Sequence, residues 1–289
     1  KEIALSLDAG IFCFNVESVQ ELEVINELAV RENKIASICL RVNPNIKAHT
    51  HTHIRTGVAE NKFGIAFDEI MYVIKLANTM SNITFKGLHF HIGSQITEMD
   101  DFISLCMCIN RLLEMMDVEG IKAEIINVGG GLGVDYDTPQ MHAIPDFHAY
   151  FQTYINNLQL RPWQTLHFEL GRSVVAQCGT LFTRVLYVKK GVQKQFAIVD
   201  AGMTDLIRPA LYHAHHKIEN ISSTAKTYEY YDVVGPICES TDVFDKQVGM
   251  PTTKRGDILA IHSIGAYGEV MASHYNCRAL PKAYTDKEI

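Results

Sequence analysis

The sequence predicts an α/β chain in which strand–helix units come first and an antiparallel β domain follows. Up to about residue 179, short apolar runs alternate with apolar residues at helical spacing. Beyond that point, strand-like runs follow one another, separated by Gly, Pro and polar residues. We therefore expect two domains, residues 1–179 and 180–289.

Five strands and four helices are expected in the first part. The first strand is expected at 11–16, and the helix after it begins at a capping box formed by Ser18 and Glu21. Further strands are expected at 37–42, 88–92, 125–128 and 165–170, with helices near 70–77, 102–116 and 146–157. In the second part, strands are expected at 181–188, 195–199, 228–234 and 258–262.

Composition and charge exclude several classes of function. The 289 residues are 47% hydrophobic, which is enough for one large core or two smaller ones. The formal charge is −7 and no basic patch stands out, so we expect no nucleic-acid partner. No apolar run is long enough to cross a bilayer, and no leader-like pattern opens the chain. The seven cysteines are odd in number and form no Cys-x-x-Cys pair, which favours the cytoplasm.

Residues with chemical function stand at the ends of four expected strands. Repeating strand–helix units build either a barrel or an open doubly wound sheet. In both folds, ligand sites lie at the carboxyl ends of the strands, so these residues should converge. They are Asn43, residues 91–94, residues 129–131 and residues 169–172.

The glycine triplet Gly129-Gly130-Gly131 is the most distinctive of these strand ends. Successive glycines allow positive φ angles and let several backbone N–H groups approach one anion. Taken alone, the triplet fits a tight loop without a ligand equally well, because short glycine motifs are common.

Together, the strand ends match a phosphate ester on a protonated aromatic ring. The glycines, Ser94 and Arg172 can hold the phosphate, Glu169 can face a ring nitrogen, and His91 can stack on the ring. Pyridoxal 5'-phosphate has these features, and a carboxylate at its ring nitrogen keeps that nitrogen protonated.

Longer motifs make the chain resemble the diaminopimelate decarboxylases, a family of alanine-racemase-like (fold-type III) pyridoxal-phosphate enzymes. The resemblance runs nearly end to end, and Leu170 replaces the proline that this family usually has before its Gly-Arg. The motifs lie at residues 14–18, 41–44, 56–57, 62–65, 89–95, 128–133, 169–172, 199–203, 208–212, 235–240, 265–268 and 271–276.

The resemblance implies a (β/α)8 barrel, here incomplete because its first strands are missing, followed by an antiparallel β domain. It implies decarboxylation of meso-diaminopimelate to L-lysine and CO2, a step of lysine biosynthesis. The implied cofactor-binding residues are His91, Ser94, Gly129, Gly130, Gly131, Glu169, Gly171, Arg172 and Tyr267. The implied substrate-binding residues are Arg172, Arg208, Tyr212, Glu239 and Tyr267, and the implied catalytic residues are Cys238 and His91.

The resemblance also implies a homodimer with shared active sites. The loop containing Cys238 and Glu239 would enter the neighbouring subunit's site, where Cys238 would handle a proton at the reacting carbon. A substrate with a second amino-acid end needs a guanidinium for its distal carboxylate and a carboxylate for its ammonium. Arg208 and Glu239 would supply these, whereas ornithine would have no use for the extra arginine.

The lysine that carries the cofactor in this family lies on the first barrel strand. The present chain is expected to begin after the third strand, so we name no such lysine and expect this stretch alone to be inactive. The alternatives are a related decarboxylase of the ornithine or arginine type, a racemase, or a non-catalytic homologue that lacks the lysine.

Two histidine-rich stretches and one cysteine pair invite other functions. Neither His49, His51 and His53 nor the run His213-Ala-His-His216 has partners at metal-ligand spacing, so we expect no metal. Cys106 and Cys108 fall within a helical pattern and are expected in or beside the core.

Overall fold

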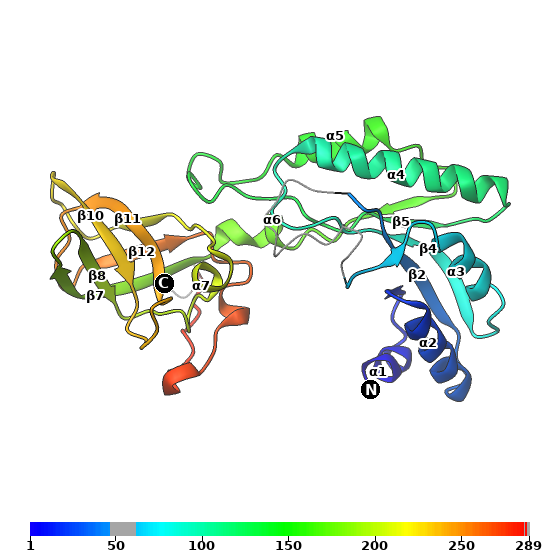
Figure 1. The fold of residues 1–289 in the computed structure, drawn as a ribbon, viewed down its shortest axis with the longest axis horizontal. Coiled ribbons are helices and arrows are strands. Elements are labelled where there is room, and N and C mark those ends of the chain that lie inside the picture. The colour runs from blue at the N-terminus through cyan, green and yellow to red at the C-terminus, as the bar shows by residue number, and fades with distance from the viewer. Residues whose placement is uncertain (47–61, 286, 288–289) are drawn as a thin grey trace. The chain divides into compact units, whose positions relative to one another are not determined.

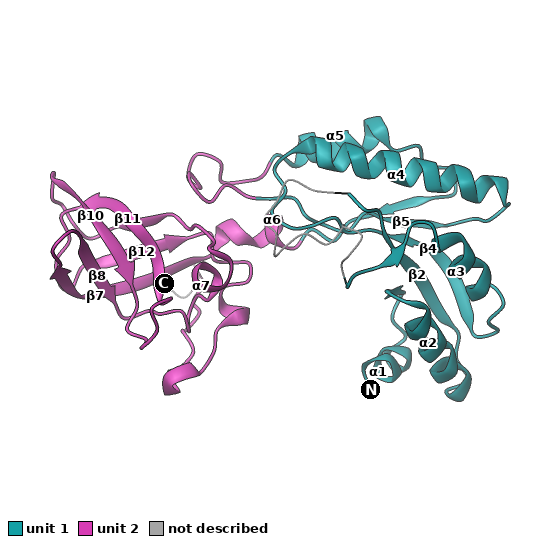
Figure 2. Cartoon of the chain, in the orientation of Figure 1, with its two compact units in different colours: residues 1–133, 146–170 teal, residues 134–145, 171–289 magenta. Residues whose placement is uncertain are grey.

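The computed structural model of the chain describes residues 1–46, 62–285 and 287 (Figure 1). It divides into two compact units, residues 1–133 with 146–170, and residues 134–145 with 171–289 (Figure 2). Residues 134–145 and 171–179 belong to the second compact unit. The boundary between the two units after residue 170 therefore comes earlier in the chain than the predicted domain boundary at 179. That boundary stays a prediction.

The first unit is built on a parallel sheet whose strands follow their order in the chain. β1 (Phe14–Val16), β2 (Ala36–Asn43), β4 (Ile83–His89), β5 (Ile125–Asn127) and β6 (Thr165–His167) are neighbours in that sequence, and β3 (Ile65–Ala66) adds to β2. A doubly wound sheet reverses its strand order at a switch point, whereas a barrel does not. The strand order is therefore that of a (β/α)8 barrel, as the sequence predicts.

Helices cover the sheet of the first unit. They are α1 (Glu2–Ala9), α2 (Val19–Arg31), α3 (Ile70–Ala77), α4 (Met99–Val118) and α5 (Phe147–Asn157). Ser18 caps α2 as predicted, because the Glu21 N–H donates to Ser18 Oγ at 3.2 Å. The Glu21 carboxylate accepts the N–H of Glu17, one residue before the cap, at 2.6 Å, so the second bond of the predicted capping box is shifted by one residue.

Helices α4 and α5 lie side by side (Figure 1) and share a buried aromatic cluster. Phe102 of α4 packs edge-on against Tyr150 of α5, with ring centroids 4.9 Å apart, and Tyr154 stands 5.2 Å from Tyr150. Cys106 is buried on the same helix and Cys108 is half-buried. Burial raises the pKa of Cys106 to about 12 and that of Cys108 to about 11, so both stay protonated as core thiols.

Two strands end earlier than the apolar runs predict. The run expected at 88–92 forms a strand over Ile83–His89, and the run expected at 165–170 ends at His167. Residues 84–87 extend the first of these strands, because they pair with β2 although their burial pattern is mixed. His91 and Glu169 consequently lie in the loops that follow β4 and β6, where loop residues from neighbouring strands can meet.

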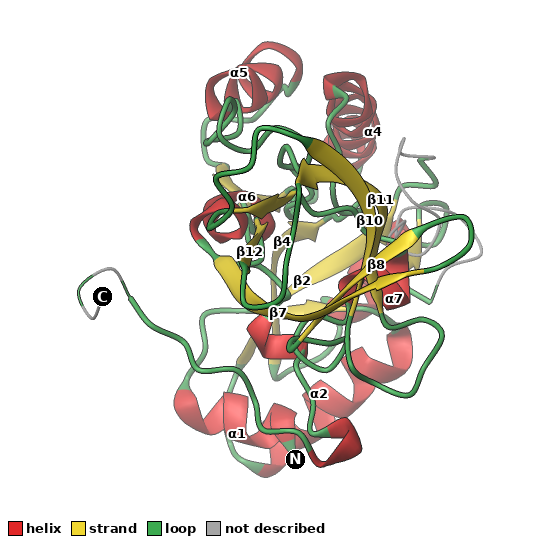
Figure 3. Cartoon of the chain, turned by 90° about the vertical axis from the view of Figure 1, so that its left-hand side faces the viewer, coloured by secondary structure: helices red, strands yellow, loops and turns green. Residues whose placement is uncertain are grey.

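The second unit contains a six-stranded, mostly antiparallel sheet, drawn as the curved yellow layer in Figure 3. Its strands are β7 (Thr180–Lys190), β8 (Gln195–Val199), β9 (Ile218–Asn220), β10 (Tyr228–Val234), β11 (Val243–Pro251) and β12 (Ile258–His262), in the order β11-β10-β8-β7-β12-β9. The pair β8–β10 is parallel and the other pairs are antiparallel. The predicted antiparallel β domain is therefore confirmed.

Several elements of the second unit were not predicted, and all of them except β11 are short. They are β9, β11, α6 (Arg172–Val175), α7 (Arg208–Tyr212) and the 3-10 turns Ala176–Cys178, Glu269–Met271 and Tyr275–Cys277. Each helix is at most five residues long, too short to show a helical period in the sequence. Within the described residues, the structure contains no helix with the length and apolar character needed to span a membrane.

Candidate active site

Glu169 lies at the centre of a set of hydrogen-bond donors from three strands of the first unit. Its Oε1 accepts from Nδ2 of Asn127 at 2.8 Å and from Nδ2 of Asn15 at 3.1 Å, and its Oε2 lies 3.3 Å from Nε2 of His89. The hydrogen bond from His89 is the main reason that the pKa of Glu169 falls to about 2. The carboxylate is therefore ionised throughout the neutral range.

The strand register explains this convergence. Arg41, His89 and Asn127 are cross-strand neighbours on β2, β4 and β5, so their side chains stand in one row on one face of the sheet. Because a carboxylate only accepts, His89 donates to it from Nε2, and its second ring nitrogen is Nδ1. That nitrogen is buried and has no hydrogen-bond partner within the described part of the chain.

His91 lies close to this cluster in an uncharged form. Burial, followed by the positive charge of Arg41, lowers the pKa of His91 to about 4. The Gly130 N–H donates to Nδ1 of His91 at 3.3 Å, so the ring hydrogen is on Nε2. The imidazole is thus a flat, neutral ring held by the glycine loop.

The glycine triplet allows two close backbone approaches. Gly129 has φ 70°, and a Cβ there would stand 2.3 Å from the Phe90 carbonyl oxygen, while a Cβ on Gly130 would stand 2.4 Å from the Glu169 carbonyl oxygen. Neither position could therefore carry a larger side chain without movement of the backbone.

Two of the three glycine amides already donate within the chain. Gly129 N–H bonds to Oδ1 of Asn127 at 2.9 Å, and Gly130 N–H bonds to His91 as described. The amide of Gly131 makes no hydrogen bond to another described residue. The loop after β4 lies against it, since Ile96 N–H donates to the Gly131 carbonyl at 2.8 Å. The backbone of this loop, which includes Ser94, is thereby brought beside the glycine loop.

A second cluster lies in the second unit and contains two buried arginines. Nη1 of Arg172 and Nη1 of Arg208 each donate to the phenol oxygen of Tyr136 at 2.8 Å. The side chain of Arg172 also lies over the ring of Tyr267, with Cζ 5.0 Å from the ring centroid. Burial lowers the pKa of Arg208, but from so high a starting value that it stays charged at neutral pH. The cluster therefore concentrates two positive charges.

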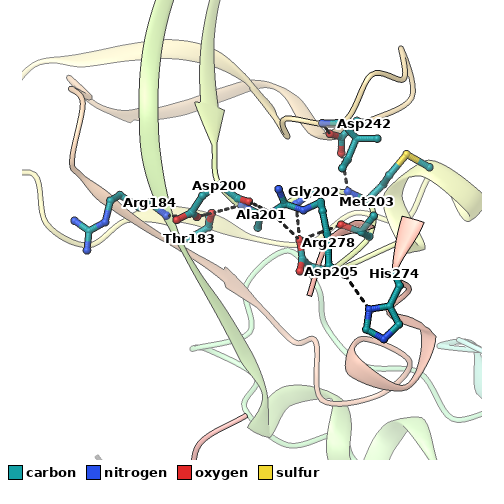
Figure 4. A network of polar contacts seen from close by, with 12 residues as sticks. Thr183, Arg184, Asp200, Ala201, Gly202, Met203, Asp205, Asp242, His274 and Arg278 are labelled. Carbon is teal, nitrogen blue, oxygen red and sulfur yellow. Dashed lines mark hydrogen bonds and ion pairs between the residues drawn. The ribbon is translucent and has the colours of Figure 1, made fainter. Parts of the chain in front are cut away.

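Polar contacts in a neighbouring network hold the loop that leads into α7 (Figure 4). Asp205 Oδ2 accepts the Gly202 N–H at 2.8 Å, and Asp242 Oδ1 accepts the Met203 N–H at 2.6 Å. Arg278 lies 3.9 Å from Asp205. These contacts fix residues 202–205, which overlap the motif at 199–203, just before the helix that begins at Arg208.

The predicted residues Tyr212, Cys238 and Glu239 of the second unit are half-buried or exposed. Tyr212 is half-buried on α7, and Cys238 is exposed. Glu239 accepts a hydrogen bond from Tyr275 Oη at 2.6 Å and, among the described residues, forms no ion pair with an arginine. In this chain Glu239 therefore does not neutralise the arginine pair.

Two histidines of the run at 213–216 contact other side chains. His215 lies 2.9 Å from Asp245, and this hydrogen bond raises the pKa of His215. His216 is buried beside Arg208. Within the described ranges, no group of three or more His, Cys, Asp or Glu could hold a metal. His49, His51 and His53 lie outside the described residues.

Sequence reasoning missed four residues of these clusters. Asn15, His89 and Asn127 surround Glu169, and Tyr136 joins the two arginines. His89 stands two residues before His91 in the motif at 89–95. Its position in that motif could therefore have indicated that it belongs to the site. Tyr136 lies in an irregular segment, and nothing in the sequence indicates its partners.

The chemical groups of these residues match those of pyridoxal 5'-phosphate. A carboxylate kept ionised suits a protonated ring nitrogen, a neutral imidazole suits a ring face, and an unengaged loop amide suits a phosphate oxygen. Nδ1 of His89, buried and without a partner among the described residues, adds a polar atom that a bound group could contact.

Comparisons with known proteins agree with this chemistry. A family model described as "Pyridoxal-dependent decarboxylase, pyridoxal binding domain" matches residues 1–176. The chain is 61% identical over 288 residues to diaminopimelate decarboxylase of Bacteroides thetaiotaomicron, covering 100% of this chain and 74% of that protein. It is 43% identical to diaminopimelate decarboxylase of Haemophilus influenzae, covering 96% of this chain and 66% of that protein.

Solved structures give the same relationship. Diaminopimelate decarboxylase from Helicobacter pylori, in complex with L-lysine, matches with a TM-score of 0.88 at 41% identity, covering 95% of this chain and 68% of that one. The enzyme from M. jannaschii, also with L-lysine, matches with a TM-score of 0.86 at 36% identity, covering 97% and 65%. The chain therefore belongs to the diaminopimelate decarboxylases, pyridoxal-phosphate-dependent carboxy-lyases that convert meso-diaminopimelate to L-lysine and CO2.

Proposed function

We propose that this chain provides both the cofactor-ring site and the substrate-carboxylate site of a meso-diaminopimelate decarboxylase. The observation that carries the proposal is the ionised Glu169, surrounded by Asn15, His89 and Asn127 and lying near a neutral His91. The relatives named as diaminopimelate decarboxylases support the substrate.

The residues of the first unit would hold the cofactor. Glu169 would keep the ring nitrogen protonated, and His91 would cover one face of the ring. Gly129, Gly130 and Gly131, with Ser94 beside them, would bind the phosphate. In the second unit, Gly171, Arg172 and Tyr267 stay predicted cofactor-binding residues. When bound, the cofactor supplies an electron-withdrawing ring that stabilises the negative charge left on the α-carbon as CO2 departs.

The arginine pair would bind the end of the substrate that does not react. Arg208, with Arg172, presents donors to a carboxylate, and an arginine–carboxylate contact of this kind is geometrically specific. Tyr212 at the end of α7 would border that site. A substrate without a distal carboxylate, such as ornithine, would leave these charges unused, which is why we favour diaminopimelate.

The catalytic proton and the distal ammonium would be handled across a subunit interface. Cys238 and Glu239 are exposed in the single chain, and we propose that they enter the site of a second copy in a homodimer. There Glu239 would accept the distal ammonium, and Cys238 would hold a proton for the reacting carbon. A location in the cytoplasm stays a prediction based on the odd number of cysteines.

Replacement of Arg208 by methionine tests the substrate assignment. The variant Arg208→Met keeps an aliphatic stem but removes a charge-assisted contact, so kcat/KM for meso-diaminopimelate should fall about 100-fold. The visible absorption of the bound cofactor should stay unchanged. Arg31→Met, on the exposed surface of α2, is the matched control. Unchanged turnover, or an equal loss of cofactor absorption, would contradict the assignment.

A further inference from the structure

The two buried arginines are held by one phenol oxygen. Arg172 and Arg208 are 8% and 5% exposed, and each donates from Nη1 to Tyr136 Oη at 2.8 Å. The guanidinium of Arg208 also lies over the ring of the same tyrosine, with Cζ 5.1 Å from the centroid. Tyr136 thus determines where both charges stand.

His216 holds Arg208 from a second direction. Nδ1 of His216 lies 2.9 Å from the backbone carbonyl of His262, and Nε2 lies 3.3 Å from Nη1 of Arg208. Because a carbonyl only accepts, the ring hydrogen is on Nδ1, and Nε2 is left to accept from the arginine. The two contacts therefore define one tautomer.

The position of His216 keeps it uncharged. It is 1% exposed and lies edge-on to Tyr136, with ring centroids 5.0 Å apart. Burial is the main reason that its pKa falls to about 4, and the nearby charges of Arg208, His215 and Arg172 act in the same direction. At neutral pH this imidazole can accept a hydrogen bond without adding charge to the cluster.

These contacts determine which edge of Arg208 remains available. Nη1 carries two hydrogens, and Tyr136 and His216 account for both. The N–H groups on Nε and Nη2 make no hydrogen bond to another described residue. They form the edge of the guanidinium that matches a carboxylate with two parallel hydrogen bonds.

The chain holds other arginines differently. Arg41 pairs with Glu17, and Arg161 pairs with Asp117 at 2.6 Å, so a carboxylate compensates each charge. Arg208 has no carboxylate within 4.0 Å among the described residues. A carboxylate at the place of Tyr136 or His216 would position the arginine equally well but would cancel the attraction for an anionic ligand.

We propose that Tyr136 and His216 are positioning residues that hold Arg208 through uncharged acceptors and so reserve its charge for the distal carboxylate of the substrate. This inference rests on the proposed function, which assigns that carboxylate to the arginine pair. It predicts a selective effect. Binding of ligands that have the distal carboxylate depends on Tyr136 and His216, whereas binding of ligands that lack it does not.

Two ligands, the product L-lysine and its decarboxylated analogue 1,5-diaminopentane, test whether the effect is selective for the distal carboxylate. L-lysine keeps the carboxylate, whereas 1,5-diaminopentane has none. In the holoenzyme, Tyr136→Phe and His216→Leu should each weaken L-lysine binding about 10-fold, measured by titration calorimetry, and leave diaminopentane binding within twofold. KM for meso-diaminopimelate should rise by a similar factor, and kcat should change less. His216→Gln should restore L-lysine binding, because its amide can donate to the His262 carbonyl and accept from Arg208.

Controls separate this inference from the function on which it rests. Tyr228→Phe, on the exposed face of β10, should bind both ligands as the wild type does. If Arg208→Met keeps full L-lysine affinity, the proposed function is wrong at this site. If Arg208→Met loses affinity but Tyr136→Phe and His216→Leu do not, only the present inference is overturned. Equal weakening of both ligands would likewise overturn it. Should His216→Leu fail to fold, Tyr136→Phe decides alone, because it retains the ring.

Discussion

The side-chain amide of Asn127 donates to Glu169 at 2.8 Å and so ties the end of β5 to the loop after β6. The same amide side chain accepts the Gly129 N–H at 2.9 Å. One residue thereby orients the carboxylate and closes the glycine loop. A change in either loop is therefore expected to reach the other through Asn127.

Neutralising Glu169 should abolish most of the activity. Glu169→Gln keeps the shape of the side chain but removes the charge that would hold a ring proton, so kcat should fall about 100-fold or more. Steady-state turnover and the visible absorption band of the cofactor would both be measured, and both should change. Glu124→Gln, a surface residue paired with Lys86, is the control. Wild-type turnover in Glu169→Gln would refute the proposed role.

A methyl group at Gly130 should disturb the cofactor site without unfolding the first unit. The added Cβ of Gly130→Ala would meet the Glu169 carbonyl oxygen at 2.4 Å, so the loop after β6 must move. We expect cofactor affinity to fall about 10-fold, measured by fluorescence titration of the apoenzyme. In Gly249→Ala the nearest atom is on the exposed ring of Tyr230 at 3.3 Å, and affinity should stay as in the wild type. Equal affinities in the two variants would count against a close-packed cofactor loop.

Acid should destabilise the protein through His216, which is buried, and His91, which is partly buried. Burial lowers the pKa of both His91 and His216 to about 4, whereas an unfolded histidine titrates near 6.5. The unfolded chain therefore binds protons first, and stability that is fully present above pH 6.5 is lost as the pH falls toward 4. Each histidine corresponds to roughly 3 kcal/mol over that range.

Urea unfolding at pH 7.5 and pH 5 measures this loss. His91→Phe and His216→Gln should each reduce the difference in the free energy of unfolding between the two pH values. His148→Gln, at an exposed position of α5, should leave the difference unchanged. If all three variants show the wild-type difference, burial of the two imidazoles is not its cause.

Subunit mixing tests whether active sites are shared. A Glu239→Ala subunit lacks the loop carboxylate, and a His91→Ala subunit lacks the ring-facing imidazole. If each site takes Glu239 from its neighbour, a dimer with one subunit of each variant contains one intact site. Random pairing makes only part of the dimers mixed, so the recovered activity should reach at most about a quarter of the wild-type value. The recovered activity would be assayed after the two proteins are dissociated and reassociated. Activity no higher than that of the separate variants would argue against shared sites.

Much of the fold could be predicted because its cause is local. The helix cap at Ser18 depends on residues three positions apart. The apolar spacing of α4 and the runs that became β8, β10 and β12 reflect short-range periodicity. The short helix α7 could not be predicted this way, because five residues contain little more than one helical turn.

The sequence by itself determined which groups are present: Glu169, His91, the glycine triplet and the arginines, in an order that matches one family of enzymes. Only the tertiary structure decided which partners set their charge and direction. Asn15 and Asn127 meet Glu169 across 154 and 42 residues, and Tyr136 meets Arg208 across 72. Such contacts depend on strand register and on loops that fold back, so the periodicity of the sequence cannot predict them. Burial of His91 and His216 lowers each pKa for the same reason, since the removal of water is a property of the packed structure.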